Sequence, residues 1–174
     1  MKGATVGLAI IAALALQTSP FFGRNGAGID LVLVVVVWAA LQFGPAAGLL
    51  TGAAAGLAQD VLSAGIIGVG GFSKTLIGYL VAVTSVRFSL ENPLARLAIV
   101  AVASAANTVL FVGLHLMLEQ PLADVSTYAG LGKTVGWRAL GDTSTAVVLF
   151  LILDRVFAEQ TAARRMAIKK RFYE

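Results

Sequence analysis

The chain has 174 residues, of which 58% are hydrophobic and only 13% are charged, and its mean hydropathy is +0.88. An average soluble domain carries roughly 25% charged residues, and a soluble chain could not cover this much apolar surface. Cysteine is absent, which excludes disulfides, thiolate metal sites and cysteine nucleophiles. The composition therefore predicts an integral membrane protein.

Six apolar runs follow one another along the chain, at about 3–19, 29–43, 45–62, 72–86, 94–118 and 140–157. They are rich in Ala, Leu, Val and Gly and lack the alternation of barrel strands. Because lipid cannot hydrogen-bond the backbone, such runs must be helices, so we expect an all-α, polytopic fold. The predicted organisation is a six-helix transmembrane domain over residues 1–157 and a basic cytoplasmic tail over residues 158–174. The segment from 119 to 136 is expected to be hydrophilic and outward-facing.

Basic residues are divided unequally between the two sides of these spans, and the side with more of them stays cytoplasmic. Nine share the side of the N-terminus: Lys2, Arg87, Arg96, Arg155, Arg164, Arg165, Lys169, Lys170 and Arg171. Four fall on the other side: Arg24, Lys74, Lys133 and Arg138. We therefore expect a multi-pass protein of the bacterial inner membrane with both termini in the cytoplasm.

The tail combines positive charge with apolar side chains, a pattern typical of a helix lying on anionic lipid. Its basic residues are Arg164, Arg165, Lys169, Lys170 and Arg171. Docking to a cytoplasmic partner is the alternative interpretation.

Glycine recurs every four residues in the third span, at Gly44, Gly48, Gly52 and Gly56. This spacing leaves a groove along one helix face, where another backbone can approach closely. Two interpretations are open. The groove packs against a neighbouring span of the same chain, or it receives the transmembrane helix of a partner protein.

Charged residues at the ends of the spans are expected to have structural roles. Asp60 ends the third span and Lys74 begins the fourth, so we expect the two to pair and to hold the loop between them. Asp30 is expected to cap the second span. Arg138 and Asp142, four residues apart on a helix, are expected to form a local ion pair.

No catalytic, metal or cofactor site is predicted. Residues 68–75 read GVGGFSKT, close to a phosphate-loop pattern, but they follow a membrane span instead of a buried strand, so no nucleotide is expected. His115 is the single histidine and cannot build a metal site alone, and no serine stands in a Gly-x-Ser-x-Gly context. Asn107 and His115 are expected to hydrogen-bond neighbouring helices, and nucleic acid is not an expected partner.

A series of residues in the first half of the chain closely resembles the MreD family of rod-shape-determining membrane proteins over about residues 28–88. The series comprises Asp30-Leu31, Phe43-Gly44-Pro45, Gly48, Gly52, Gly56, Gln59-Asp60, Leu62, Gly65, Gly68, Ser73-Lys74-Thr75 and Gly78-Tyr79. The resemblance implies a non-enzymatic scaffold of the elongation machinery, which inserts peptidoglycan along the side wall and maintains cell shape. It also implies an MreC-like single-span partner with a periplasmic domain, together with RodA, a class B penicillin-binding protein and MreB.

MreD-like proteins also look like the substrate-binding subunits of energy-coupling-factor vitamin transporters, which share a compact six-helix fold. This likeness supplies an alternative function, a small-molecule carrier with a pocket among its outer helix ends. The glycine groove and the sparse polar residues favour the scaffold. A closed, polar-lined cavity holding a ligand, with the glycine face buried inside the monomer, would favour the carrier.

Overall fold

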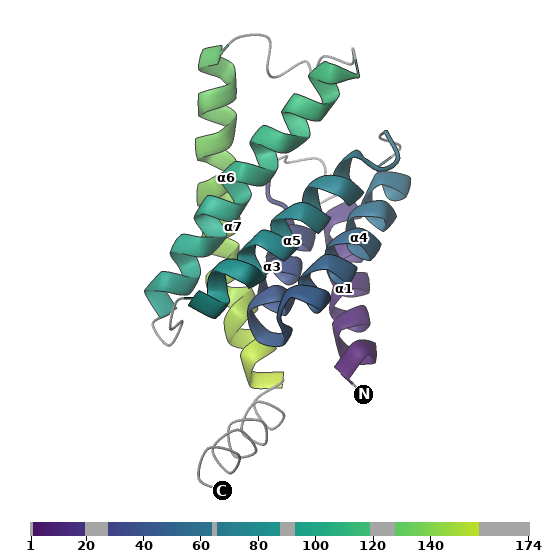
Figure 1. Ribbon diagram of the computed structural model, residues 1–174, viewed down its shortest axis with the longest axis vertical. Helices are drawn as coiled ribbons and strands as arrows, with labels where there is room; N and C mark the ends of the chain where they lie inside the picture. Colours follow the sequence, from purple (N-terminus) through teal and green to yellow (C-terminus); the bar gives the residue numbers. More distant parts are fainter. Residues whose placement is uncertain (1, 20–27, 64–65, 88–92, 119–127, 157–174) are drawn as a thin grey trace, which may run out of the picture.

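The computed structural model describes residues 2–19, 28–63, 66–87, 93–118 and 128–156. Within these ranges the chain is all-α, as predicted. Its helices are α1 (Lys2–Thr18), α3 (Leu31–Phe43), α4 (Pro45–Leu62), α5 (Val69–Arg87), α6 (Pro93–Met117) and α7 (Tyr128–Val156). The beginning of α1 and the end of α7 lie at the same end of the bundle (Figure 1), which we call the terminal end. The opposite end, where α1 and α4 end and α3 and α5 begin, is the far end.

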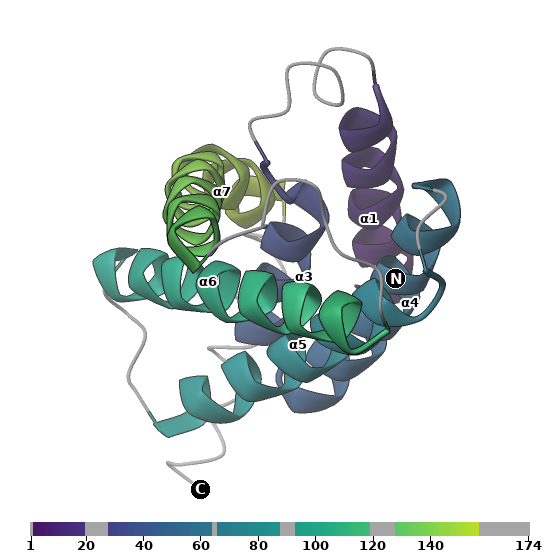
Figure 2. The same ribbon diagram turned by 90° about the horizontal axis from the view of Figure 1, so that it is seen from above.

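Helix α3 is the centre of the bundle. Its sequence LVLVVVVWAALQF is apolar on all sides, as expected of a helix enclosed by others. Every residue from Leu31 to Ala40 is buried, and the helix contacts all five other helices (Figure 2). Its 13 residues span only about 20 Å, less than the roughly 30 Å of a hydrocarbon core. Because α3 is short and buried, the other helices supply most of the outer surface of the bundle.

The glycine face of α4 packs against α5 of the same chain. A Cβ added at Gly48, Gly52 or Gly56 would lie only 2.3 to 2.5 Å from a backbone carbonyl oxygen of α5. No larger residue fits at this separation, so the two backbones approach as closely as the spacing of the glycines predicts. Gly44 differs, because it forms the turn before Pro45 with φ +88 and has open space around it.

Helix α7 begins at Tyr128, well before the predicted start near residue 140. Half of the segment expected to be hydrophilic, residues 128–136, is thus the first part of a 29-residue helix that packs along α6. Its polar groups do not prevent this, because the Thr134 hydroxyl donates to the Gly130 carbonyl of its own helix at 2.9 Å. The segment 119–127 lies outside the described residues.

The outer faces of the helices are apolar. Leu8, Ile11, Leu50, Val102 and Leu151 are each between 65% and 70% exposed. Among the described residues, Pro93–Met117 and Gly130–Arg155 are long and apolar enough to cross a membrane, and Thr5–Thr18 and Leu31–Phe43 are shorter apolar helices. Apolar side chains on the outside of several helices fit a lipid environment better than water.

The α4–α5 contact predicts a position-dependent effect of adding one methyl group. Gly52→Ala should lower the free energy of unfolding by about 1–3 kcal/mol, because the new Cβ meets the Lys74 carbonyl oxygen, a backbone atom. Gly113→Ala is the matched control, since its Cβ would meet nothing within 4 Å. It should stabilise the helix by about 0.5–1 kcal/mol. Equal unfolding midpoints for the two purified variants would show that the close contact is not required.

Candidate functional site

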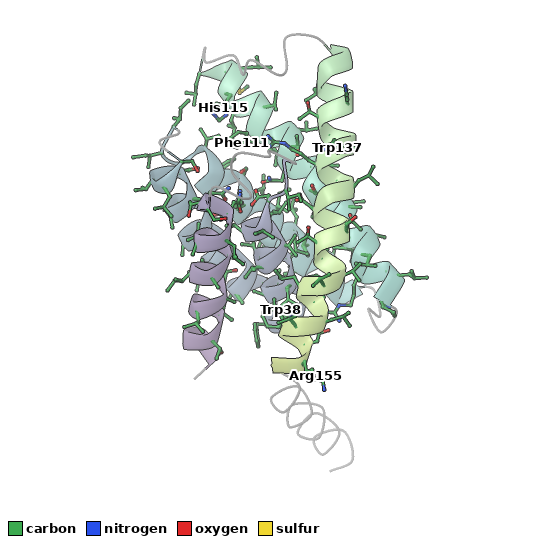
Figure 3. The ribbon with its side chains drawn as sticks, turned by 180° about the vertical axis from the view of Figure 1, so that it is seen from behind. Trp38, Phe111, His115, Trp137 and Arg155 are labelled. Atoms are coloured by element: carbon green, nitrogen blue, oxygen red, sulfur yellow. The ribbon has the colours of Figure 1, made fainter. Side chains whose placement is uncertain are left out.

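A polar pocket of about 220 Å³ lies at the far end of the bundle. Five helices contribute to its lining, through Gln17 of α1, Gln59 and Asp60 of α4, Lys74 of α5, Asn107, Phe111 and His115 of α6, and Arg138 of α7, and they are joined by Asp30, the residue before α3. Figure 3 shows Phe111 and His115 toward this end of α6, and their rings lie 4.3 Å apart. The pocket gathers most of the polar side chains that stood out in the sequence.

Asp30 and Lys74 form a buried ion pair at the base of the pocket. The Lys74 Nζ lies 2.7 Å from the Asp30 Oδ2, and the two side chains are 3% and 16% exposed. The other carboxylate oxygen of Asp30 accepts from the backbone N–H of Leu33 at 3.0 Å, which makes Asp30 the N-cap of α3, as predicted. One aspartate therefore caps the central helix and neutralises the lysine of α5.

Asp142 of α7 is fixed next to this pair. Its carboxylate accepts a hydrogen bond from the backbone N–H of Asp30 at 2.6 Å and a second one from the hydroxyl of Ser104 on α6. It is 1% exposed. The predicted ion pair between Arg138 and Asp142 is therefore wrong, because the Asp142 carboxylate turns inward to Asp30 and Ser104. Among the described residues Arg138 forms no ion pair within 4 Å.

Asp60 closes the loop between α4 and α5 through backbone contacts. Its carboxylate accepts from the N–H groups of Gly68, Gly70 and Gly71 at 2.8 to 3.1 Å. A Cβ at Gly70 would collide with the carboxylate, so glycine is required at this position for the approach. The stretch that resembles a phosphate loop thus does bind an anion, the carboxylate of the preceding helix.

The predicted Asp60–Lys74 pair is not formed, because each residue has another partner. The first turn of α5 presents backbone N–H groups to Asp60, while the Lys74 side chain reaches the start of α3 and pairs with Asp30. The backbone from Gly68 to Gly71 is nevertheless held, by hydrogen bonds to the Asp60 carboxylate instead of by an ion pair.

Two buried amide groups of the pocket lack a hydrogen-bond partner on one atom, the Asn107 Oδ1 and the Gln59 Oε1. Asn107 is 5% exposed. His115 bonds through Nδ1 to the Phe111 carbonyl of its own helix at 2.9 Å. The expectation that Asn107 and His115 bond neighbouring helices is therefore wrong for the Nδ1 of His115 and for the Asn107 carbonyl.

A second polar cluster lies at the terminal end. The Asp154 carboxylate of α7 accepts from Trp38 Nε1 at 2.9 Å, from Gln42 Nε2 at 3.0 Å and from the Arg96 guanidinium at 2.7 Å. Figure 3 shows Trp38 toward this end of the molecule, and the Arg96 guanidinium stacks over the Phe150 ring, 4.8 Å from its centroid. The cluster ties α3, α6 and α7 together.

An apolar groove of about 590 Å³ runs between α1 and α4 near the terminal end. We call it the α1–α4 groove, and it is lined by Gly3, Val6, Gly7, Ile10, Phe43, Ala47, Leu50, Thr51 and Ala54. Gly3 and Gly7 are one helical turn apart, and a Cβ at either would meet nothing within 4 Å. Their spacing is the small-residue pattern of membrane helix contacts. Unlike the glycines of α4, they have no close neighbour among the residues that the structure describes.

The sequence contained signals for some of these features. The spacing of Gly3 and Gly7 in the first span is a signal for the α1–α4 groove. Asn107 is a signal for the pocket, because a polar residue within an apolar span is costly and indicates a structural or functional role. Nothing in the sequence pairs Asp154 with Trp38, because their helices meet only in the fold. The tail residues Arg164, Arg165, Lys169, Lys170 and Arg171 lie outside the described residues.

The acidic side chains of the pocket and its lysine have partners within the chain. Asp30, Asp60 and Lys74 are each bound to partners within the chain itself. Within the described ranges no group of three or more His, Asp or Glu side chains is placed to hold a metal ion. Among the described residues of the lining, the Asn107 and Gln59 amide oxygens accept no hydrogen bond and Arg138 forms no ion pair within 4 Å.

Comparison with known proteins gives one match. Residues 4–157 match the family model described as rod shape-determining protein MreD. This range includes all of the pocket and nearly all of the α1–α4 groove. No curated protein and no solved structure matches the chain.

The ion pair predicts strong coupling between two specific residues. Lys74→Met should cost about 3–5 kcal/mol of unfolding free energy, because it leaves the Asp30 carboxylate buried without its partner. Asp30→Asn keeps the helix cap, since Asn caps as well as Asp. The double variant Asp30→Asn/Lys74→Met should therefore lose much less than the sum of the single losses, measured by denaturant unfolding of the purified protein.

Asp60→Asn combined with Lys74→Met is the control for this cycle. These two residues have separate partners, so their losses should add within about 0.5 kcal/mol. Additive losses for Asp30 and Lys74, or strong coupling between Asp60 and Lys74, would contradict the observed pairing.

Proposed function

The chain belongs to the MreD family of rod shape-determining proteins, and we propose that it is a non-enzymatic scaffold that holds the transmembrane helix of an MreC-like partner. The observation that supports the proposal is the α1–α4 groove, in which the space beside Gly3 and Gly7 is open. The glycine face of α4 cannot serve this purpose, because α5 already fills it.

The groove has the properties that a helix contact in lipid requires. Apolar burial drives little association between helices in a membrane, so close packing against small residues supplies much of the affinity. Glycine inside a helix costs roughly 0.5–1 kcal/mol relative to alanine. Gly3 and Gly7 bear this cost without a turn or a contact in the described residues that needs glycine. Close packing of a partner helix against α1 would explain why glycine occupies these two positions.

The same proposal places six spans in the bacterial inner membrane with both termini in the cytoplasm, in the compact arrangement of energy-coupling-factor substrate-binding subunits. The support is the excess of basic residues on one side and the common end at which α1 begins and α7 ends (Figure 1). The far-end pocket then faces outward, and the basic tail lies on anionic lipid. The wider assembly would include RodA, a class B penicillin-binding protein and MreB.

A substrate-binding subunit of a vitamin-type transporter is the second candidate. Two observations favour it, the polar pocket at the far end and the glycine face buried inside the monomer. The family match favours the scaffold. A ligand pocket is compatible with a scaffold, so the two features do not exclude each other.

The proposal predicts that filling the groove blocks partner binding without unfolding the protein. Gly7→Leu should reduce co-purification of an MreC-like partner by at least about tenfold, since close helix contacts tolerate no added bulk. Gly113→Leu on α6 is the matched control, because it also has open space around it but does not line the groove. Both variants should purify as monodisperse protein. Equal partner recovery from the two variants would contradict the proposed docking face.

The membrane orientation predicts the behaviour of reporter fusions at Glu174. A reporter that is active only in the cytoplasm should be active there, and one active only in the periplasm should be silent, because the basic side stays inside. Fusions in the 119–127 segment should give the opposite pattern. A periplasmic signal at Glu174 would refute the orientation.

A further inference from the structure

We propose that Asp142 of α7 is a proton-binding site that titrates near neutral pH, and that the bound proton stabilises the far-end contact of α7 with α3 and α6. The inference does not depend on the scaffold role, because it rests on the surroundings of one carboxyl group. It makes the packing of the bundle sensitive to the pH on the side of the far-end pocket.

Asp142 is a buried acid without an ion pair. Its side chain is 1% exposed, and among the described residues no Lys, Arg or His nitrogen lies within 4 Å of its carboxyl oxygens. Its two hydrogen-bond donors, the Asp30 backbone N–H and the Ser104 hydroxyl, are both neutral. A carboxylate that has lost its water and has no cation beside it is costly, and binding a proton removes that cost.

A second aspartate of the same helix has the partners that Asp142 lacks. Asp154 accepts from the Arg96 guanidinium at 2.7 Å and also from the side chains of Trp38 and Gln42. Its side chain is 36% exposed, so water reaches it as well. The negative charge is therefore compensated at the terminal end of α7 and not at the far end.

The charged side chains around Asp142 act in opposite directions. Among the described residues, Asp30 and Arg138 influence it electrostatically. Asp30 repels an ionised Asp142, although Lys74 of α5 offsets part of this effect by pairing with Asp30 at 2.7 Å. Arg138 attracts it from one turn earlier on α7, but this side chain is only half-buried and forms no ion pair within 4 Å. Because these contributions oppose each other, burial decides in favour of the neutral acid.

The far-end pocket gives the proton a route to Asp142. Asp30 and Arg138 line the pocket, and the carboxyl group of Asp142 contacts the Asp30 backbone directly. Asp60 and His115 line the pocket too, but Asp60 is held by backbone N–H groups of α5 and His115 by a carbonyl of its own helix. Asp142 is thus the uncompensated acid that a proton in the pocket meets next to the lining.

The hydrogen bonds of Asp142 also suit the protonated form. Its carbonyl oxygen accepts from the Asp30 N–H, and its O–H can donate to Ser104, because a hydroxyl oxygen accepts as well as donates. An ionised Asp142 would instead leave two carboxylates beside the single ammonium of Lys74. Since the folded protein then binds this proton more tightly than the unfolded chain does, the stability of the fold decreases as the pH rises through the titration.

Infrared spectroscopy of the full chain, purified in detergent, detects the proton directly. A protonated carboxyl group has a C=O stretching band that is separate from the carboxylate bands, and subtracting the spectrum of Asp142→Asn isolates the band of this residue. We expect the band to grow as the pH falls from about 9 to about 5. Asp154→Asn is the matched control on the same helix and should retain the band.

Three infrared results would overturn the proposal. No difference band at any pH would show that Asp142 stays ionised, and a band of constant size would show that it does not titrate. Loss of the same band in Asp154→Asn would show that the proton is bound elsewhere.

Thermal unfolding tests the effect of the proton on the fold. Asn is neutral at every pH and keeps an acceptor for the Asp30 N–H, so Asp142→Asn should fold and mimic the protonated acid. As the pH rises from about 5 to about 9, the midpoint of the unmodified chain should fall relative to that of Asp142→Asn by about 3 °C or more. Asp154→Asn should follow the pH dependence of the unmodified chain. Equal pH dependence of the unmodified chain and Asp142→Asn would contradict the stabilising role of the proton.

Discussion

The backbone contact between α4 and α5 determines where the polar groups of this protein lie. Because Gly52 has no side chain, the Lys74 carbonyl can approach it, and this fixes the rotation of α5 that sends the lysine toward α3. The Gly56 contact at the next turn brings Gly70 close to α4, and its N–H meets the Asp60 carboxylate. A larger residue in this face would separate the helices and leave both charges without their present partners.

The central helix is fixed by polar groups at both of its ends. At the far end Asp30 caps α3, and its backbone N–H donates to Asp142 of α7. At the terminal end Trp38 and Gln42 donate to Asp154 of the same α7. Between these ends, from Leu33 to Val37, the side chains of α3 are all apolar. The two clusters therefore set the position of α3 along α7, in a bundle where apolar packing alone would allow sliding.

Sequence patterns predicted the helices well because the length and composition of each apolar run indicate a helix without reference to the rest of the fold. The turn at Gly44-Pro45 and the close approach at Gly52 could be read directly, since proline and glycine spacing have local causes. The partner of Lys74 could not be read this way. Asp60 is nearer in sequence, but its carboxylate is satisfied by backbone N–H groups that no residue identity reveals. The early start of α7 was not predicted because residues 128–136 include polar side chains. The Thr134 hydroxyl donates a hydrogen bond to a carbonyl of its own helix, so its polarity does not prevent helix packing.

Helix α1 connects the two proposed binding features. Gly3 and Gly7 line the α1–α4 groove near its beginning, and Gln17 lines the pocket near its end, where its side-chain oxygen accepts from the Val32 N–H at 3.3 Å. Among the described helices, α1 packs chiefly on α3 and α4, so fewer contacts hold it than hold α3. Two occupants influence each other's affinity when both bias the same conformational equilibrium of the protein. For a helix in the groove and a ligand in the pocket, α1 and α4 are the two helices that line both places, so a shift of either helix would change both linings at once.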